Sequence, residues 1–211
     1  MLEHAFGVEA RRRIEEAVRV AERENTGQIV PVVVEKSAGY PEARYRGALL
    51  GAAVATLAVL LTGSRISLGE LPLLQLSAGG LGALLALVPA LERILAGRAE
   101  IELATRERAV RAFYENGLSH TAQGTGVLVF ASLFERRAVV LGDHGIHAKA
   151  GDLAWRGAVD RLSEGLRRGD PAAGFCEAIA LCGAELRKHF PRPPGGGPGN
   201  ELEDGLRASK R

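Results

Sequence analysis

Two long stretches without a charged residue dominate the pattern of hydrophobic and polar positions along the chain. Residues 47–64 and residues 71–91 contain no Asp, Glu, Lys or Arg. As helices they would extend ~27 and ~32 Å, close to the ~30 Å hydrocarbon core of a bilayer. Neither run shows the polar stripe of a helix that covers a soluble core. The pattern predicts a transmembrane helical hairpin over residues 45–97, with a short connection from Thr62 to about Glu70.

Small residues recur at helical spacing in both runs. Such rows allow two helix backbones to approach closely in lipid, and they leave open a contact with another membrane protein. The rows consist of Gly47, Gly51 and Ala55 in the first run and Gly82, Ala86 and Ala90 in the second.

Basic residues flank the hairpin on its outer sides, while its connection carries Arg65 alone. The positive-inside rule therefore predicts a bacterial inner-membrane protein with two spans, with both termini and the remaining sequence in the cytoplasm. The first ten residues lack the apolar run of a secretory signal, which agrees with this orientation. The flanking residues are Lys36, Arg44 and Arg46 before the hairpin and Arg93, Arg98, Arg106 and Arg108 after it.

The two blocks outside the hairpin, residues 1–44 and 98–190, alternate between helical and strand periodicity. We interpret them as one discontinuous α/β domain, a small mixed β-sheet sandwiched by helices. Pro31 removes a ladder donor, which predicts a sheet edge or a bulge at that position. The helix that follows the hairpin is expected to bury Ala109, Val110 and Phe113. The predicted helices cover residues 8–25, 98–117, 155–166 and 175–186, and the predicted strands cover residues 28–35, 125–133 and 137–142.

The last segment, residues 191–211, is rich in Pro and Gly and then in charged residues. This composition cannot build a core, so the segment is predicted to be a flexible tail.

Composition narrows the functional classes. The chain has 211 residues, of which 46% are hydrophobic, so a disordered chain is excluded. Two cysteines are too few for a disulfide scaffold or a four-thiolate zinc site, and the spacing of Cys182 is that of a core residue. A formal charge of +2, from 27 basic and 25 acidic residues, gives no reason to expect nucleic acid as a partner.

The clearest candidate for chemistry is the segment that follows the third predicted strand. Asp143 at a strand end is placed to bind a divalent cation such as calcium, and His144 and His147 could add nitrogen ligands for zinc. The alternative is an aspartate that caps a turn beside two solvated histidines. The sequence contains no P-loop, no HExxH and no GxSxG motif, so no catalytic residues are predicted.

Several short motifs, in this order and spacing, resemble the TPM domain family of thylakoid-lumen, photosystem-repair and receptor-modulator proteins. The resemblance implies an α/β/α sandwich, a bound calcium or other divalent ion, acid phosphatase activity in some members, and a role in maintaining membrane complexes. This chain departs from the family pattern at Gly124 and Thr125, where many members carry an acidic residue and Asn, and at His144, where related membrane members carry Arg. The motifs are Thr26 to Val30, Gly126 to Phe130, Glu135 to Arg137, Asp143 to Ile146, Trp155, the region from Gly165 to Gly174, His189 to Pro191 and Asn200 to Leu202.

Three functional hypotheses result. The first is a membrane-anchored TPM-like accessory or maintenance factor for a membrane complex, with no enzymatic activity of its own or only a weak one. The second is a divalent-metal-dependent, acid-phosphatase-like hydrolase centred on Asp143. The third is a soluble α/β protein in which every apolar helix is buried.

Overall fold

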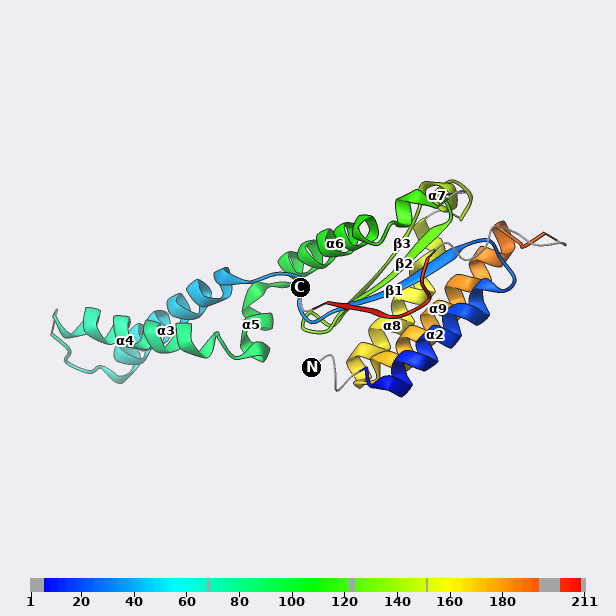
Figure 1. Cartoon of the computed structure of the whole chain (residues 1–211). Coiled ribbons are helices and arrows are strands. Elements are labelled where there is room, and N and C mark those ends of the chain that lie inside the picture. The colour runs from blue at the N-terminus through cyan, green and yellow to red at the C-terminus, as the bar shows by residue number, and fades with distance from the viewer. Residues whose placement is uncertain (1–5, 68, 122–123, 151, 194–201, 210–211) are drawn as a thin grey trace. The chain divides into compact units, whose positions relative to one another are not determined.

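The computed structural model describes residues 6–67, 69–121, 124–150, 152–193 and 202–209, without the side chains of residues 147, 148, 150, 152 and 153. The chain forms two compact units (Figure 1). We call residues 1–38 and 104–211 the sheet domain and residues 39–103 the insert.

Within the described residues, the strands form one four-stranded sheet in the order β3-β2-β1-β4. Strand β1 pairs in parallel with β2 and with β4, while β2 and β3 form an antiparallel hairpin. The α/β prediction with a mixed sheet is confirmed. The strands are β1 (Gln28–Val34), β2 (Gly126–Ser132), β3 (Arg137–Gly142) and β4 (Arg207–Ser209).

Pro31 lies where β1 is locally an edge. The amide of Gln28 and the carbonyl of Val34 bond toward β2, so the even-numbered residues of β1 face that neighbour. The ring nitrogen of Pro31 therefore faces the opposite side, and β4 begins only at the position opposite Val32. The missing N–H of Pro31 thus interrupts no pairing with β2 or β4, as predicted for proline at an edge.

Helices cover both faces of the sheet (Figure 1). Helices α2 (Val8–Glu22), α8 (Arg156–Arg168) and α9 (Pro171–His189) pack on the face that carries Ile29 and Val33. Helix α6 (Arg98–Glu115) packs on the other face, through residues that lie within the sheet domain. The period of two in β1 and β2 divides their side chains between these cores. The α6-side cluster consists of Val30, Val32, Val34, Ala109, Ala112, Phe113, Leu118, Leu128 and Phe130.

Two details differ from the sequence prediction. Val110 is exposed, because the buried side of α6 is displaced toward Ala109, Ala112 and Phe113. Residues 207–209 form strand β4 rather than a flexible tail, and Leu206 is buried beside it. Three residues can join a sheet through backbone bonds alone, so composition carried no signal for this strand.

The insert contains helices α3 (Pro41–Thr62), α4 (Glu70–Leu85) and α5 (Pro89–Ala96). The prediction of one helix across residues 71–91 is wrong, because α4 and α5 meet at an angle of 103°. Pro89 occupies the first turn of α5, where it needs no amide donor, whereas a continuous helix would have lost a hydrogen bond there.

Helices α3 and α4 pack closely along the predicted small residues. A Cβ atom on Gly51 would lie 2.2 Å from the carbonyl oxygen of Ala78, and one on Gly82 would lie 2.1 Å from that of Gly47. Glycine is therefore required at these crossings. The side-chain amide of Gln75 also donates a 2.8 Å hydrogen bond to Thr56 Oγ1 across the same pair of helices.

Candidate functional site

Asp143 lies between β3 and the short helix α7 (His144–Ala150), with its side chain buried. Its amide donates to the carbonyl of Gly126 at the start of β2, which fixes the backbone at this end of the sheet. Atom Oδ1 accepts the amide of His144 at 2.7 Å and lies 3.0 Å from His144 Nδ1. Atom Oδ2 is buried without a hydrogen-bond partner among the described residues.

His144 lies on the surface, with 87% of its side chain exposed. A Cβ atom on Gly124 would lie 2.7 Å from its imidazole ring, so the ring occupies the space that a side chain at position 124 would need. Gly124 also has a positive φ of 62°, which favours glycine. Gly124 and His144 are therefore neighbours in space, and the His144 ring limits the room at position 124.

Among the described residues, Asp143 and His144 alone do not complete a ligand set for a divalent ion. The described residues contain no group of three or more His, Cys, Asp or Glu side chains placed to hold one metal. Asp143 and His144 are bonded to each other, and the side chain of His147 lies outside the described part of the structure. Calcium takes six to eight oxygen ligands and zinc three or four protein ligands, so Asp143 with His144 fits neither alone.

A buried carboxyl group that the sequence did not single out lies at the helix–strand junction before β1. Glu22 Oε1 accepts the amide of Ile29 at 2.6 Å, and only 7% of the residue is exposed. The pKa of Glu22 is raised to about 7, mainly because the carboxyl group is buried and to a smaller extent by the charge of Asp204, while the hydrogen bond from Ile29 and the charge of Arg192 oppose the shift. The surrounding charged residues of α2 gave this position the pattern of a solvated helix face.

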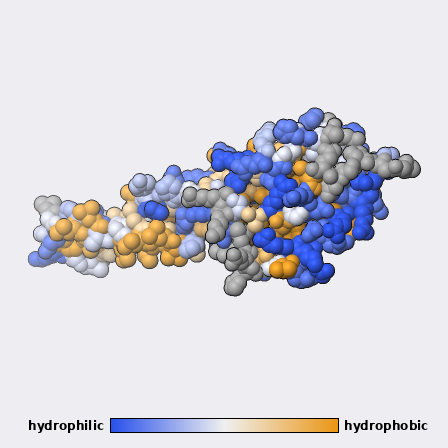
Figure 2. Space-filling view, viewed as in Figure 1, coloured by the Kyte–Doolittle hydropathy of each residue, from blue (hydrophilic) through white to orange (hydrophobic). Residues whose placement is uncertain are grey.

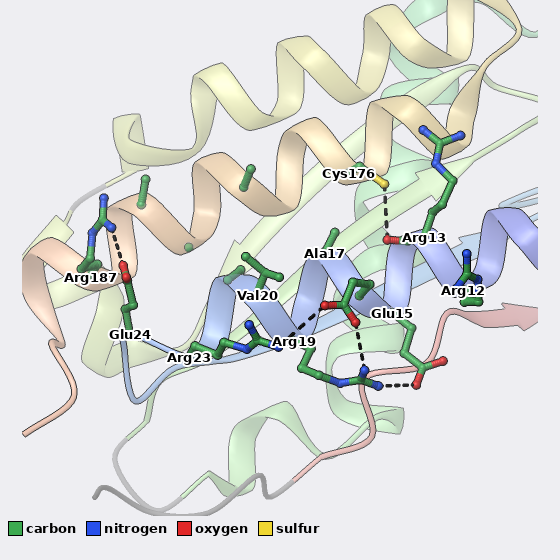
Figure 3. A pocket seen from close by; sticks show the side chains of 15 residues that line it. Arg12, Arg13, Glu15, Ala17, Arg19, Val20, Arg23, Glu24, Cys176 and Arg187 are labelled. Carbon is green, nitrogen blue, oxygen red and sulfur yellow. Dashed lines mark hydrogen bonds and ion pairs between the residues drawn. The ribbon is translucent and has the colours of Figure 1, made fainter. Parts of the chain in front are cut away.

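A surface groove of about 1050 Å³ runs between α2 and α9 (Figure 3). Its floor contains small residues, and its rim carries arginines that are already paired with carboxylates. Arg19 bonds to Glu15 and Glu16, and Arg187 bonds to Glu24. Five arginines and three glutamates line the groove, so these pairs cancel only part of its positive charge. The floor consists of Ala17, Ala21, Ala180, Gly183 and Ala184.

The two thiols are not activated. Cys182 is fully buried in the core, which confirms its predicted place and raises its pKa to about 12. Cys176 is half-buried in the groove wall, its Sγ lies 3.7 Å from the carbonyl oxygen of Arg13, and burial raises its pKa as well. A nucleophilic cysteine needs a lowered pKa, so neither residue is suited to that role.

The insert has an apolar surface (Figure 2). Helix α3 is long and apolar enough to cross a membrane, and only 6% of its apolar window is buried. Helices α4 and α5 meet the same criterion of length and composition only if the bent pair is counted as one span. The exposed large apolar residues of α3 and α4 are Leu49, Leu50, Val54, Leu57, Leu60, Leu61, Leu73, Leu74, Leu76, Leu81, Leu84 and Leu85.

Comparisons with known proteins establish the fold of the chain and nothing finer. No protein-family model matches the sequence, and no curated protein matches it. The NMR structure of the BA42 protein from the psychrophilic bacterium Bizionia argentinensis is similar, with a TM-score of 0.58 at 18% sequence identity. The match covers 96% of this chain and 94% of that one. At this identity the structural match shows a shared fold, and it does not show a shared activity.

Proposed function

We propose that the protein is a TPM-like sheet domain anchored in a bacterial inner membrane by its insert, where it helps a membrane complex to assemble or persist. The observation that carries this proposal is the exposed apolar surface of α3 and α4. Monomeric soluble proteins rarely expose contiguous apolar patches larger than a few hundred Å². Leu60 and Leu61 are more than 70% exposed, as expected for side chains that face lipid.

The lengths of the two helices agree with each other. The uncharged part of α3 runs from Gly47 to Thr62, and that of α4 runs from Leu71 to Leu85, one residue fewer. They rise about 22–24 Å, less than the ~30 Å hydrocarbon core. A local thinning of the bilayer would absorb this mismatch at a modest cost. The excess of Lys and Arg outside the hairpin supports a sheet domain in the cytoplasm.

An accessory role, rather than catalysis, fits the sheet domain best. In the described residues, Asp143 pairs only with the exposed His144, no group of three or more metal-ligand side chains is present, and the pKa of both cysteines is raised. The charged side chains Arg19 and Arg187, which flank the groove between α2 and α9, form ion pairs with glutamates and position no reactive group there.

Membrane anchoring is tested by fractionation of cells that produce the full chain. The protein is expected to stay in the membrane pellet after washes with high salt and with alkaline carbonate, because only embedded helices resist both. A matched variant, Val54→Arg, places a charge at the centre of α3 and should weaken retention, whereas Val8→Arg in the exposed start of α2 should not. Release of the wild-type protein by carbonate would exclude the anchor.

A second function, metal-dependent phosphate-ester hydrolysis at Asp143, is favoured by one observation, the buried and unbonded Asp143 Oδ2. It is tested by turnover of a chromogenic phosphate ester with calcium, magnesium or zinc. If the wild type turns over the ester and Asp143→Asn does not, hydrolysis replaces the accessory role as the proposed function. If the wild type shows no turnover with any of the three ions, the accessory role is supported.

A further inference from the structure

Hydrogen bonds from α3 fix the orientation of α5 and its position along α3. The chain turns through 103° between α4 and α5, and Pro89 starts the new helix. The guanidinium of Arg46 on α3 donates to the carbonyl oxygens of Leu95 and Ala96 at 2.6 and 2.8 Å, so it caps the C-terminal end of α5. Arg46 also forms an ion pair with Glu100.

The place of Arg46 in the sequence shows where α5 lies along α3. Arg46 is the last charged residue before the uncharged run of α3, so it marks the level at which that helix leaves the apolar region. Helix α5 is bonded to that same side chain and therefore lies at that level. If α3 and α4 cross the bilayer, a helix at 103° to α4 runs nearly parallel to the membrane plane.

The exposed side of α5 is apolar. Ile94 is 72% exposed and Leu91 is also exposed, three positions apart on one helical face. Leu87 and Val88 in the preceding bend are exposed as well, so the apolar surface of α4 continues into α5. Ala96, on the opposite side of the helix from Leu91 and Ile94, is buried.

From this geometry we infer that α5 is an interfacial helix, which inserts Leu91 and Ile94 at the headgroup–acyl boundary of the leaflet where the chain enters and leaves the membrane. The occupant of this face is a lipid surface, because the face is continuous with the apolar surface of α4 and ends at the charged Arg46–Glu100 pair. Amphipathic helices of this kind bury their apolar side several ångströms into the interface. The inference rests on the proposed membrane anchor, and it adds that the insert has two crossing helices and one helix that lies flat.

The test uses tryptophan reporters in the full chain, reconstituted into phosphatidylcholine vesicles whose lipids carry bromine at chosen depths. The variants are Ile94→Trp, Val54→Trp at the centre of α3, and Val8→Trp on the exposed start of α2 in the sheet domain. The single native tryptophan, Trp155, is buried in the sheet domain, so the wild-type signal is subtracted as background.

We expect Ile94→Trp to lose most fluorescence with bromines near the headgroup and Val54→Trp with bromines near the bilayer centre. Val8→Trp should lose none with either lipid. If Val54 is quenched as expected but Ile94 is unquenched, α5 lies in water and the inference is wrong. Quenching of Ile94 at the depth of Val54 also overturns it, because α5 would then lie in the hydrocarbon core and not at the headgroup–acyl boundary. If Val54→Trp is not quenched, the membrane anchor is overturned, and the inference that α5 is an interfacial helix fails with it.

Discussion

Replacing Glu22 with Gln should stabilise the sheet domain at high pH and leave it nearly unchanged at low pH. The carboxyl group is buried at the junction of α2 and β1, and its pKa is raised to about 7 from an ordinary value of 4.5. Between these two values the folded chain retains a proton that the unfolded chain has released. The native state thus binds more protons in this range, and its stability falls as the pH rises from about 4.5 to about 7.

The size of the effect follows from the shift. A difference of 2.5 pKa units between folded and unfolded states corresponds to about 3 kcal/mol at pH 8, at roughly 1.36 kcal/mol per unit. Glutamine keeps an oxygen to accept the Ile29 amide but carries no charge to bury. Glu22→Gln should therefore exceed the wild type in free energy of unfolding by up to about 3 kcal/mol at pH 8, and by much less at pH 4.5.

Urea titration of the full chain in detergent micelles measures this difference, because Trp155 is the single tryptophan and reports on the sheet domain. Glu24→Gln is a suitable control, since Glu24 is exposed and pairs with Arg187 on the surface. The control should shift stability little at either pH. Equal stability of Glu22→Gln and wild type at pH 8, or the same difference at both pH values, would refute the argument.

Three further outcomes concern the contact of α3 with α4, metal binding at Asp143 and the accessibility of the two cysteines. Gly82→Ala should destabilise the contact of α3 with α4 by about 1–3 kcal/mol through overpacking, while Gly80→Ala, whose added Cβ meets nothing within 4 Å, should not; thermal unfolding of the insert in micelles compares them. If a divalent ion binds at Asp143, calcium, magnesium or zinc at about 100 times its dissociation constant should stabilise the wild type by about 2.7 kcal/mol and Asp143→Asn by nothing; no shift with any of the three would remove the metal site. A thiol reagent should modify Cys176 in the folded chain and Cys182 only after unfolding, and equal rates would contradict the burial of Cys182.

The hydrophobic pattern predicted the sheet domain well where a strand or helix buries apolar side chains. The near-continuous apolar runs of β1 and β2 predicted strands, which bury side chains in both cores, and the spacing of Phe175, Ile179 and Cys182 marks the buried side of α9. Strand β4 escaped prediction because its pairing with Val32 to Val34 uses the backbone and needs no apolar pattern.

The insert shows that the absence of charged residues does not predict a single continuous helix. Residues 71–91 carry none, but Pro89 within them begins a new helix, and this proline was the available signal for the bend. At the candidate site, the sequence placed Asp143 at a strand end correctly. It could not show that His144 fills the space beside Gly124, or that Glu22 points inward, because both depend on contacts between distant segments.

The central claim, that α3 and α4 cross a bacterial inner membrane, is tested most directly by cysteine labelling in spheroplasts with a membrane-impermeant maleimide. Ser67→Cys in the connection between the helices and Val8→Cys in the sheet domain are compared, with the wild type as the blank for the two native cysteines. The account predicts that Ser67→Cys is labelled in intact spheroplasts and that Val8→Cys is labelled only after lysis. Labelling of both positions only after lysis would contradict the two crossings.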